Sequence, residues 1–419
     1  MNHLSVSILV LCTFLAPVVW AQQRVAPHMG RHVPLTVSAT NNLSRTTRTA
    51  QSDDVKIYYL GHDSGGTWAE PRGINDFGAV VAEGDVAGGY THQIWASLFA
   101  PQAGWSDLGS FGGEDTTGWL AEGGAISDTG MIVGSAGTDQ GYTHAFVWTP
   151  SLTTKVDLGT LGSDPGSVAI GVNKIGTLIV GLSYNDLQST AVVWTPQVVW
   201  KQDGLTITWK IQELPTGGLE KPGKVFKGVT LDWWGGWSVN DFGQIAGDAW
   251  SDNYDETAVI WNPHLFGKGW TITQLPHRAD NPGKPNYRYT EALSINESGE
   301  IVGDLGGEGW PTATPAFWKT DSPGGTTWNL TVLPTLSGSQ QGWNVAWCIN
   351  DLGDIVGVSN DADGNSFAAR WSTKDSNFVQ VLGFPGTWSI ALKVNDQHMA
   401  IGAYGSDTIQ EDVVAMQIP

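Results

Sequence analysis

Aromatic residues recur at one position before a repeated asparagine, and their chemistry suits the binding of sugars. Six of them stand seven or eight residues before the marker residue of a repeated phrase: Trp68, Trp119, Trp233, Tyr289, Trp343 and Trp388. An aromatic ring can stack on the apolar face of a sugar. It can also pack between repeated units as a structural residue. The sequence leaves both roles open, and we take ligand binding as the hypothesis for all six.

Carboxylates in the same connections could serve hydrolysis, because glycoside hydrolases use a carboxylate pair about 5–10 Å apart. The candidates are Glu70, Glu114, Asp115, Glu122, Asp232 and Glu291. No Gly-x-Ser-x-Gly, His-Glu-x-x-His or Cys-x-x-Cys motif occurs, so we assign no catalytic residue. A glycoside hydrolase or polysaccharide lyase is therefore an alternative to a binding protein without enzymatic activity. A purely structural surface protein is the third hypothesis.

One acidic connection resembles the start of a calcium-binding loop. Asp361, Asp363 and Asn365 place side-chain oxygens at alternate positions, as such loops do. Ser366 stands where the loop usually has Gly, and Ser372 where it has Glu. The pattern predicts a Ca²⁺ site, with an ordinary exposed hairpin turn as the alternative. No other cofactor is predicted.

These residues are carried by a repeated unit. The phrase Ile-Asn-Asp-x-Gly-x-Ile-Val-Gly recurs seven times in variant forms, 45 to 67 residues apart, at Asn75, Ser127, Asn173, Asn240, Asn296, Asn350 and Asn395. Each unit has four short apolar runs, and Asn-Asp-x-Gly is typical of a tight turn between the first two. Four antiparallel strands per unit predict the blade of a β-propeller. We expect an all-β protein with seven such blades.

The order of the strands predicts two faces and a closed ring. Connections from the fourth strand to the next first strand, and from second to third, should emerge together on what we call the loop face. The Asn-Asp-x-Gly turns should emerge on the opposite turn face. The chain enters the repeats with a fourth-type strand at 55–61 and finishes with a third-type strand at 413–416. We expect the first strand to complete the last blade and hide both edges.

Charge and composition indicate the compartment and the partners. Residues 1–21 carry no Lys, Arg, Asp or Glu and contain an apolar run too short to span a membrane, which predicts a secretory signal. Residues 22–54 are predicted to be a flexible leader and 55–419 the propeller. The chain has 21 basic and 41 acidic residues, a balance that repels nucleic acid and anionic lipid. We expect a secreted or periplasmic monomer that binds a neutral glycan or a protein, without membrane insertion.

The repeats resemble a known family. Ile-Asn-x-x-Gly-x-Ile-Val-Gly, then His144-Ala145-Phe146 before a Trp, then Leu-Gly, is similar to the bacterial extracellular HAF-repeat family over about 55–419. The resemblance implies an exported repeat protein and carries no catalytic residues. Cys348, which lies in the apolar run Val345–Ile349, is expected to be a buried thiol without a disulfide partner.

Overall fold

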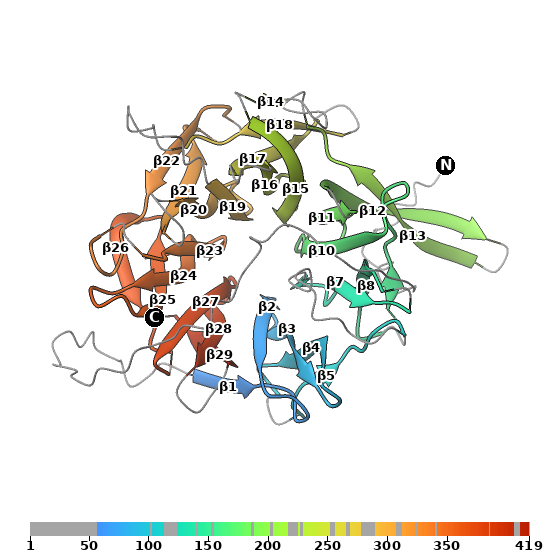
Figure 1. Ribbon diagram of the computed structural model, residues 1–419, viewed down its shortest axis with the longest axis horizontal. Helices are drawn as coiled ribbons and strands as arrows, with labels where there is room; N and C mark the ends of the chain where they lie inside the picture. The colour runs from blue at the N-terminus through green and yellow to red at the C-terminus, as the bar shows by residue number, and fades with distance from the viewer. Residues whose placement is uncertain are drawn as a thin grey trace, which may run out of the picture.

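The computed structural model is a ring of seven antiparallel sheets, which confirms the predicted seven-bladed propeller (Figure 1). It describes residues 57–100, 103–112, 124–139, 141–151, 155–185, 188–201, 204–216, 225–226, 229–251, 256–264, 269–277, 290–306, 312–322, 325–339, 342–384, 386–405 and 411–418. The predicted signal and leader lie outside these residues. Within them there is no helix long and apolar enough to cross a membrane.

Six blades have their four strands in chain order from the ring axis outward, and in the seventh the N-terminal strand takes the outermost place. The innermost strands are β2 (Ala69–Ile74), β6 (Gly124–Ile126), β10 (Gly166–Val172), β15 (Val229–Val239), β19 (Thr290–Ile295), β23 (Val345–Ile349) and β27 (Trp388–Val394). The second strands are β3 (Ala79–Val86), β7 (Ile132–Gly137), β11 (Ile179–Tyr184), β16 (Ile245–Ser251), β20 (Ile301–Gly306), β24 (Asp354–Asn360) and β28 (Met399–Gly405).

The outer half of each blade completes the pattern. The third strands are β4 (Tyr90–Ser97), β8 (Thr143–Trp148), β12 (Ser189–Lys201), β17 (Glu256–Pro263), β21 (Ala313–Thr320), β25 (Ser366–Ser372) and β29 (Asp412–Gln417). The fourth strands are β5 (Ser106–Asp107), β9 (Val156–Asp157), β13 (Gly204–Glu213), β18 (Trp270–Gln274), β22 (Trp328–Val332), β26 (Asp375–Val381) and β1 (Ile57–Gly61). The fourth blade has one extra short strand, β14 (Val225–Phe226), beside β15.

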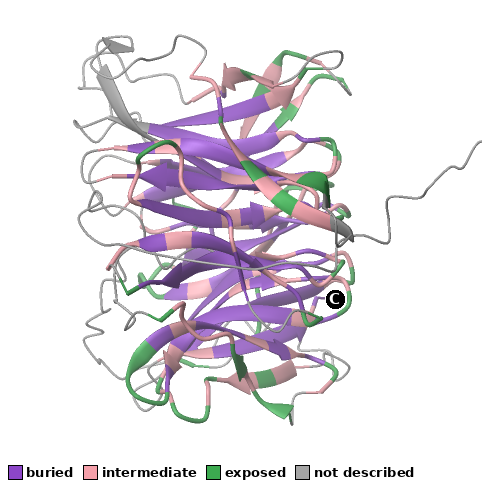
Figure 2. Ribbon diagram, turned by 90° about the vertical axis from the view of Figure 1, so that its right-hand side faces the viewer, coloured by how far each residue is buried: buried purple, intermediate pink, exposed green. Residues whose placement is uncertain are grey.

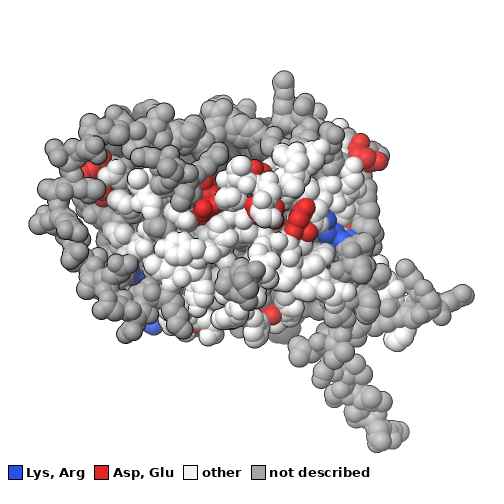
Figure 3. Space-filling model, turned by 90° about the horizontal axis from the view of Figure 1, so that it is seen from below, with Lys and Arg blue, Asp and Glu red and all other residues white. Residues whose placement is uncertain are grey.

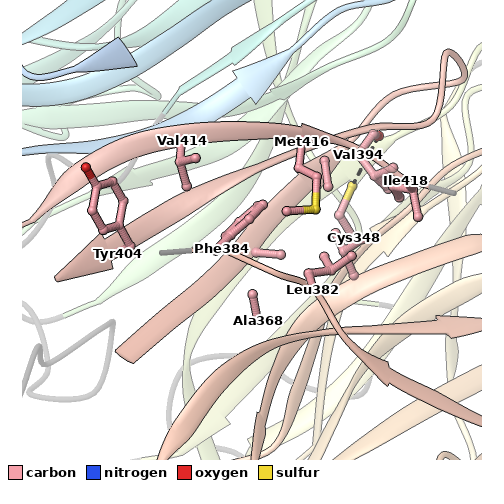
Figure 4. Close-up of a cluster of buried hydrophobic side chains, with 12 residues drawn as sticks. Cys348, Ala368, Leu382, Phe384, Val394, Tyr404, Val414, Met416 and Ile418 are labelled. Atoms are coloured by element: carbon pink, nitrogen blue, oxygen red, sulfur yellow. Dashed lines mark hydrogen bonds between the residues drawn. The ribbon is translucent and has the colours of Figure 1, made fainter. Parts of the chain in front are cut away.

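Closure occurs as the sequence predicts. β1 pairs antiparallel with β29, with Ile57 opposite Met416 and Tyr59 opposite Val414. Ile57 also packs against a buried cluster shared by blades 6 and 7, which contains Cys348 with its free thiol (Figure 4). The N-terminal strand therefore completes the last blade, and its pairing covers the outer edge of β29.

Indole groups bind neighbouring blades together. Four tryptophans of third strands are fully buried, and each Nε1–H donates to a carbonyl oxygen at the end of the preceding blade: Trp194 to Leu158, Trp261 to Pro215, Trp318 to Pro276 and Trp371 to Pro334. This confirms the packing role expected for the Trp of the third run. The buried strands form the interior of the ring, and exposed residues gather at its rims and loops (Figure 2).

The junction between blades 1 and 2 uses a lysine instead. The buried Lys155 amine donates to the Gly109 carbonyl oxygen and lies 4.8 Å from the ring centre of Phe111 and 5.0 Å from that of Phe146. Burial lowers the pKa of Lys155 to about 7. Trp148, the tryptophan of this blade's third strand, is only partly buried and lies beside Trp95.

Candidate functional site

The described loop aromatics occupy equivalent places on the loop face, as their equal spacing predicts. The Trp68 backbone N–H donates to Asp85 Oδ1 at 2.8 Å, and the Trp343 N–H donates to Asn360 Oδ1. Trp388 begins β27 opposite Gly405. These three partners stand ten residues after the repeat Asn of their own blades, at the end of the second strand. Hydrogen bonds to the second strand thus hold two of the tryptophans at the entrance to the innermost strand.

Each of these three tryptophans is partly buried, which is intermediate between the packing and the binding hypotheses. Trp343 and Trp388 pack, together with Trp347 and Leu293, against one buried cluster that spans blades 5 to 7: Ala313, Val345, Val358, Ile390, Leu392 and Ala403. One side of each indole therefore rests on the core while part of the ring stays accessible. The third-strand tryptophans at 0 % exposure have no such accessible surface.

For most of the other predicted site residues, the structure describes no side-chain contact with Trp343 and Trp388. Trp119 and Tyr289 lie outside the described residues, as do Glu114, Asp115 and Glu122. The structure describes only the backbone of Trp233 and Asp232, which lie in β15. Trp68, on the first blade, is a neighbour of Glu411 through a short parallel bridge that joins it to the last blade.

Two further tryptophans, missed from the sequence, stand at a repeated bulge. In six innermost strands the register with the second strand skips the residue three before the repeat Asn: Arg72, Ile170, Trp237, Leu293, Trp347 and Leu392. Bulges redirect a side chain and are frequent beside functional sites. The buried Nε1 atoms of Trp237 and Trp347 have no hydrogen-bond partner among the described residues. Their common offset from the Asn could have identified them.

The carboxylate candidates that are described form pairs within single blades. Glu70 is buried and lies opposite Glu83, and Arg72 is 3.4 Å from a Glu70 oxygen and 2.9 Å from a Glu83 oxygen. Glu291 lies opposite Asp304. Burial, followed by the neighbouring Glu291 and Asp248, raises the pKa of Asp304 well above its usual range.

The turn face is closed by rings of hydrogen bonds that the repeat phrase itself supplies. In five blades the Asn side-chain amide donates to the carbonyl oxygen of the equivalent residue one blade ahead: Asn75 to Ser127 (3.0 Å), Asn240 to Asn296 (3.0 Å), Asn296 to Asn350 (3.1 Å), Asn350 to Asn395 (2.9 Å) and Asn395 to Asn75 (2.8 Å). The Asn is therefore both a turn residue and a link between blades.

The next residue forms a second ring, which we call the carboxylate ring: Asp76, Asp128, Asp241, Glu297, Asp351 and Asp396. Their carboxylates accept backbone N–H groups from the preceding turn, as Asp128 does from Asp76 at 2.9 Å and Asp76 from Asp396 at 2.8 Å. Lys174 holds the equivalent place in blade 3, and its amine reaches Asp351 and Asp396 of blades 6 and 7. It thus spans the axis on the turn face.

The pKa values show that the positive charge of Lys174 does not compensate the negative charge of the six residues in the carboxylate ring. Burial, with a contribution from Asp241 and Asp351, raises the pKa of Glu297 to about 7. Burial and the neighbouring Asp76 and Asp396 also raise the pKa of Asp128. The bonds to Asp351 and Asp396 outweigh burial at Lys174 and raise its pKa above the usual value. The turn face therefore carries excess negative charge.

This excess predicts a stability that depends on pH. Between pH 4.5 and 7 folded Glu297 keeps a proton that the unfolded chain has lost, so the wild type loses stability as pH rises through this window. We expect Glu297→Gln to melt at a higher temperature than the wild type at pH 8 and at nearly the same temperature at pH 4.5. Thermal denaturation at both values measures this. The exposed Glu213→Gln is the control, and an equal difference at both pH values contradicts the prediction.

The predicted calcium residues form a hairpin turn between β24 and β25. Asp361 Oδ1 accepts the backbone N–H groups of Asp363 and Asn365, both at 2.9 Å. The Asn365 amide also donates to the Asp361 carboxylate, so it turns its NH₂ group to that carboxylate. Within the described ranges, no three His, Cys, Asp or Glu side chains are grouped so as to hold a metal ion. The turn explains the residue pattern without a cation, and calcium stays a prediction.

No family model and no curated protein matches the sequence. Among solved structures, Trypanosoma rangeli sialidase is similar at 9% identity and TM-score 0.44, over 88% of this chain and 60% of the sialidase. TolB from Acinetobacter baumannii aligns at 9% identity and TM-score 0.37, over 87% of this chain and 80% of its own. A mutant Aleuria aurantia lectin with alpha-methyl-L-fucoside aligns at 11% identity and TM-score 0.37, over 78% of this chain and 99% of its own. With such low scores, function is argued from this chain's own residues.

Proposed function

We propose that this chain is an exported binding module of the HAF-repeat type that holds a neutral glycan on its loop face. The observation that carries the proposal is the pair of partly exposed indoles at the loop-face entrances of blades 6 and 7, namely Trp343 and Trp388, which pack on one buried cluster. Core contacts fix the orientation of these rings before a ligand arrives, so little side-chain entropy is lost on binding. Flat, preoriented indoles suit the C–H face of a sugar.

Polar groups near the innermost strands suit the hydroxyl groups of a sugar. The buried Nε1–H groups of Trp237 and Trp347 find no acceptor among the described residues, so each can donate to a water. Buried carboxyl groups at Glu70 and Asp304 add polar character to the loop-face ends of blades 1 and 5. An apolar surface with a few polar groups is typical of small-ligand sites.

The charge of the molecule indicates a ligand without acidic groups. The chain carries a net charge of −20, and acidic side chains outnumber basic ones on the side shown in Figure 3. An anionic polysaccharide would be repelled by this field, whereas a neutral one would not. A partner protein remains the other ligand class consistent with the same surface.

A glycan array screened with residues 22–419 tests the proposal, followed by calorimetric titration of the best ligand. Stacking contributes on the order of 1 kcal/mol per aromatic ring, so Trp343→Ala and Trp388→Ala should each weaken binding about fivefold. Trp200→Ala is the matched control, because Trp200 is 80 % exposed on the hairpin of β12 and β13 that extends outward from the ring (Figure 1).

Three results would contradict glycan binding at this group. The array could show no bound neutral glycan, the Trp200→Ala control could weaken binding as much as the site variants, or both site variants could keep full affinity. If Trp343→Ala instead unfolds the protein at low denaturant, circular dichroism will show it, and Trp343→Phe then tests the stacking without a large cavity.

A further inference from the structure

Exposed apolar side chains stand around the turn face, where the fold does not require them. The residue between Asp and Gly of the repeated turn is exposed in all seven blades, and in four it is large and apolar: Phe77 (68 % exposed), Ile175 (45 %), Phe242 (69 %) and Leu352 (40 %). We call these four the apolar rim. Such a turn position accepts almost any residue, and polar residues dominate turns in general. Large apolar residues repeated at this exposed position indicate contact with another molecule.

A fifth exposed side chain extends the rim over blade 1. Phe99 is 74 % exposed and follows β4, in a connection that emerges on the same face as the turns. Its ring lies against Gly78, in the turn that carries Phe77, since a Cβ at Gly78 would be 2.7 Å from Phe99 Cε2. Phe99 therefore lies beside the turn that carries Phe77 and adds a second exposed aromatic ring there.

The carboxylate ring adjoins the apolar rim, because each rim residue directly follows a ring position in sequence. The ring residues are partly exposed, so a partner on this face can reach them. Among the described residues the ion pairs of the ring come from Lys174, which contacts Asp351 and Asp396. The other four ring residues, Asp76, Asp128, Asp241 and Glu297, are also acidic and accept backbone N–H groups. Burial, with a contribution from the neighbouring Asp241 and Asp351, raises the pKa of Glu297.

Lys174 shows which chemistry the ring accepts. Its side-chain ammonium donates to the carboxylates of Asp351 and Asp396, which stand 177 and 222 residues further along the chain. A second cationic side chain arriving from outside would meet the remaining carboxylates, while its apolar neighbours would cover the rim. A second copy of this chain is a poor occupant, because two molecules of net charge −20 repel each other.

We propose that the turn face is a docking surface for a protein segment that presents a lysine or arginine flanked by apolar side chains. The apolar rim supplies the contact area, and the carboxylate ring selects the charge of the partner. This interaction uses the face opposite to the proposed glycan site. The two can therefore be tested and can fail independently.

The experiment pans a phage-displayed library of random dodecapeptides against the intact protein, with depletion on the Phe77→Ser/Phe242→Ser double variant. The enriched peptides should share a Lys or Arg next to aromatic or aliphatic residues. Synthetic copies should bind the double variant at least tenfold more weakly than the wild type, and Asp241→Asn should reduce both the affinity and its salt dependence. The melting temperature of the double variant should be unchanged, because both rings are exposed.

Trp200→Ser is the matched control, since it removes an exposed aromatic residue from the hairpin of β12 and β13, which extends outward from the ring (Figure 1). The proposal is overturned if no peptide family is enriched, if the enriched peptides lack basic residues, or if Trp200→Ser weakens binding as much as the double variant. Sedimentation supplies a further check. A wild-type dimer that the double variant dissociates would assign the face to a second copy and overturn the proposal.

Discussion

Removal of β1 is expected to destabilise the protein far more than removal of the segment before it. A variant lacking residues 22–62 loses the strand that pairs with β29, together with the burial of side chains such as Ile57 and Leu60. Each such side chain contributes about 1.5–3 kcal/mol, so the free energy of unfolding should fall by about 5 kcal/mol. The variant lacking residues 22–62 also loses the Leu60 carbonyl oxygen that accepts the Trp105 indole N–H at 2.9 Å. Chemical denaturation measures the difference.

The control is a variant lacking residues 22–52, which retains β1 and should unfold like the parent. Equal unfolding free energies for the two truncations would contradict a stabilising closure. A synthetic peptide of residues 55–63, added to the shorter variant, should restore part of the lost stability because it can pair with the exposed edge of β29.

The second large effect is expected at a blade junction. Trp318 is fully buried in β21, and its Nε1–H donates to the Pro276 carbonyl oxygen at 2.7 Å. Trp318→Ala leaves a large cavity and an unsatisfied carbonyl, so the free energy of unfolding should fall by about 3–5 kcal/mol. Trp318→Phe keeps most of the volume and should cost less. Urea denaturation followed by circular dichroism gives both values.

Trp200→Ala provides the comparison, since it removes the same side chain from an exposed position and should change stability by about 0.5 kcal/mol or less. If Trp318→Ala and Trp200→Ala have similar effects, the indoles do not hold the blades together as the structure indicates.

The loop tryptophans show how far sequence reasoning reaches. Equal offsets from the repeat Asn predicted equivalent backbone positions, and the structure places Trp68, Trp343 and Trp388 accordingly at the entrances of innermost strands, opposite the ends of second strands. The offsets could not predict exposure, because burial depends on what the adjacent blade presents. Trp347 was also missed: it stands at a bulge in the strand register and packs on the same buried cluster as Trp343 and Trp388.

The sequence by itself determined the number of blades, the order of strands and the closing strand, because turn residues and alternating apolar runs act over a few neighbouring residues. Only the tertiary structure showed that the repeated Asn and Asp join successive turns in rings. It also showed that Lys174 spans the axis to blades 6 and 7. These contacts join residues tens to hundreds of positions apart. Closure of the ring brings these residues together in space, and a local sequence pattern does not predict such contacts.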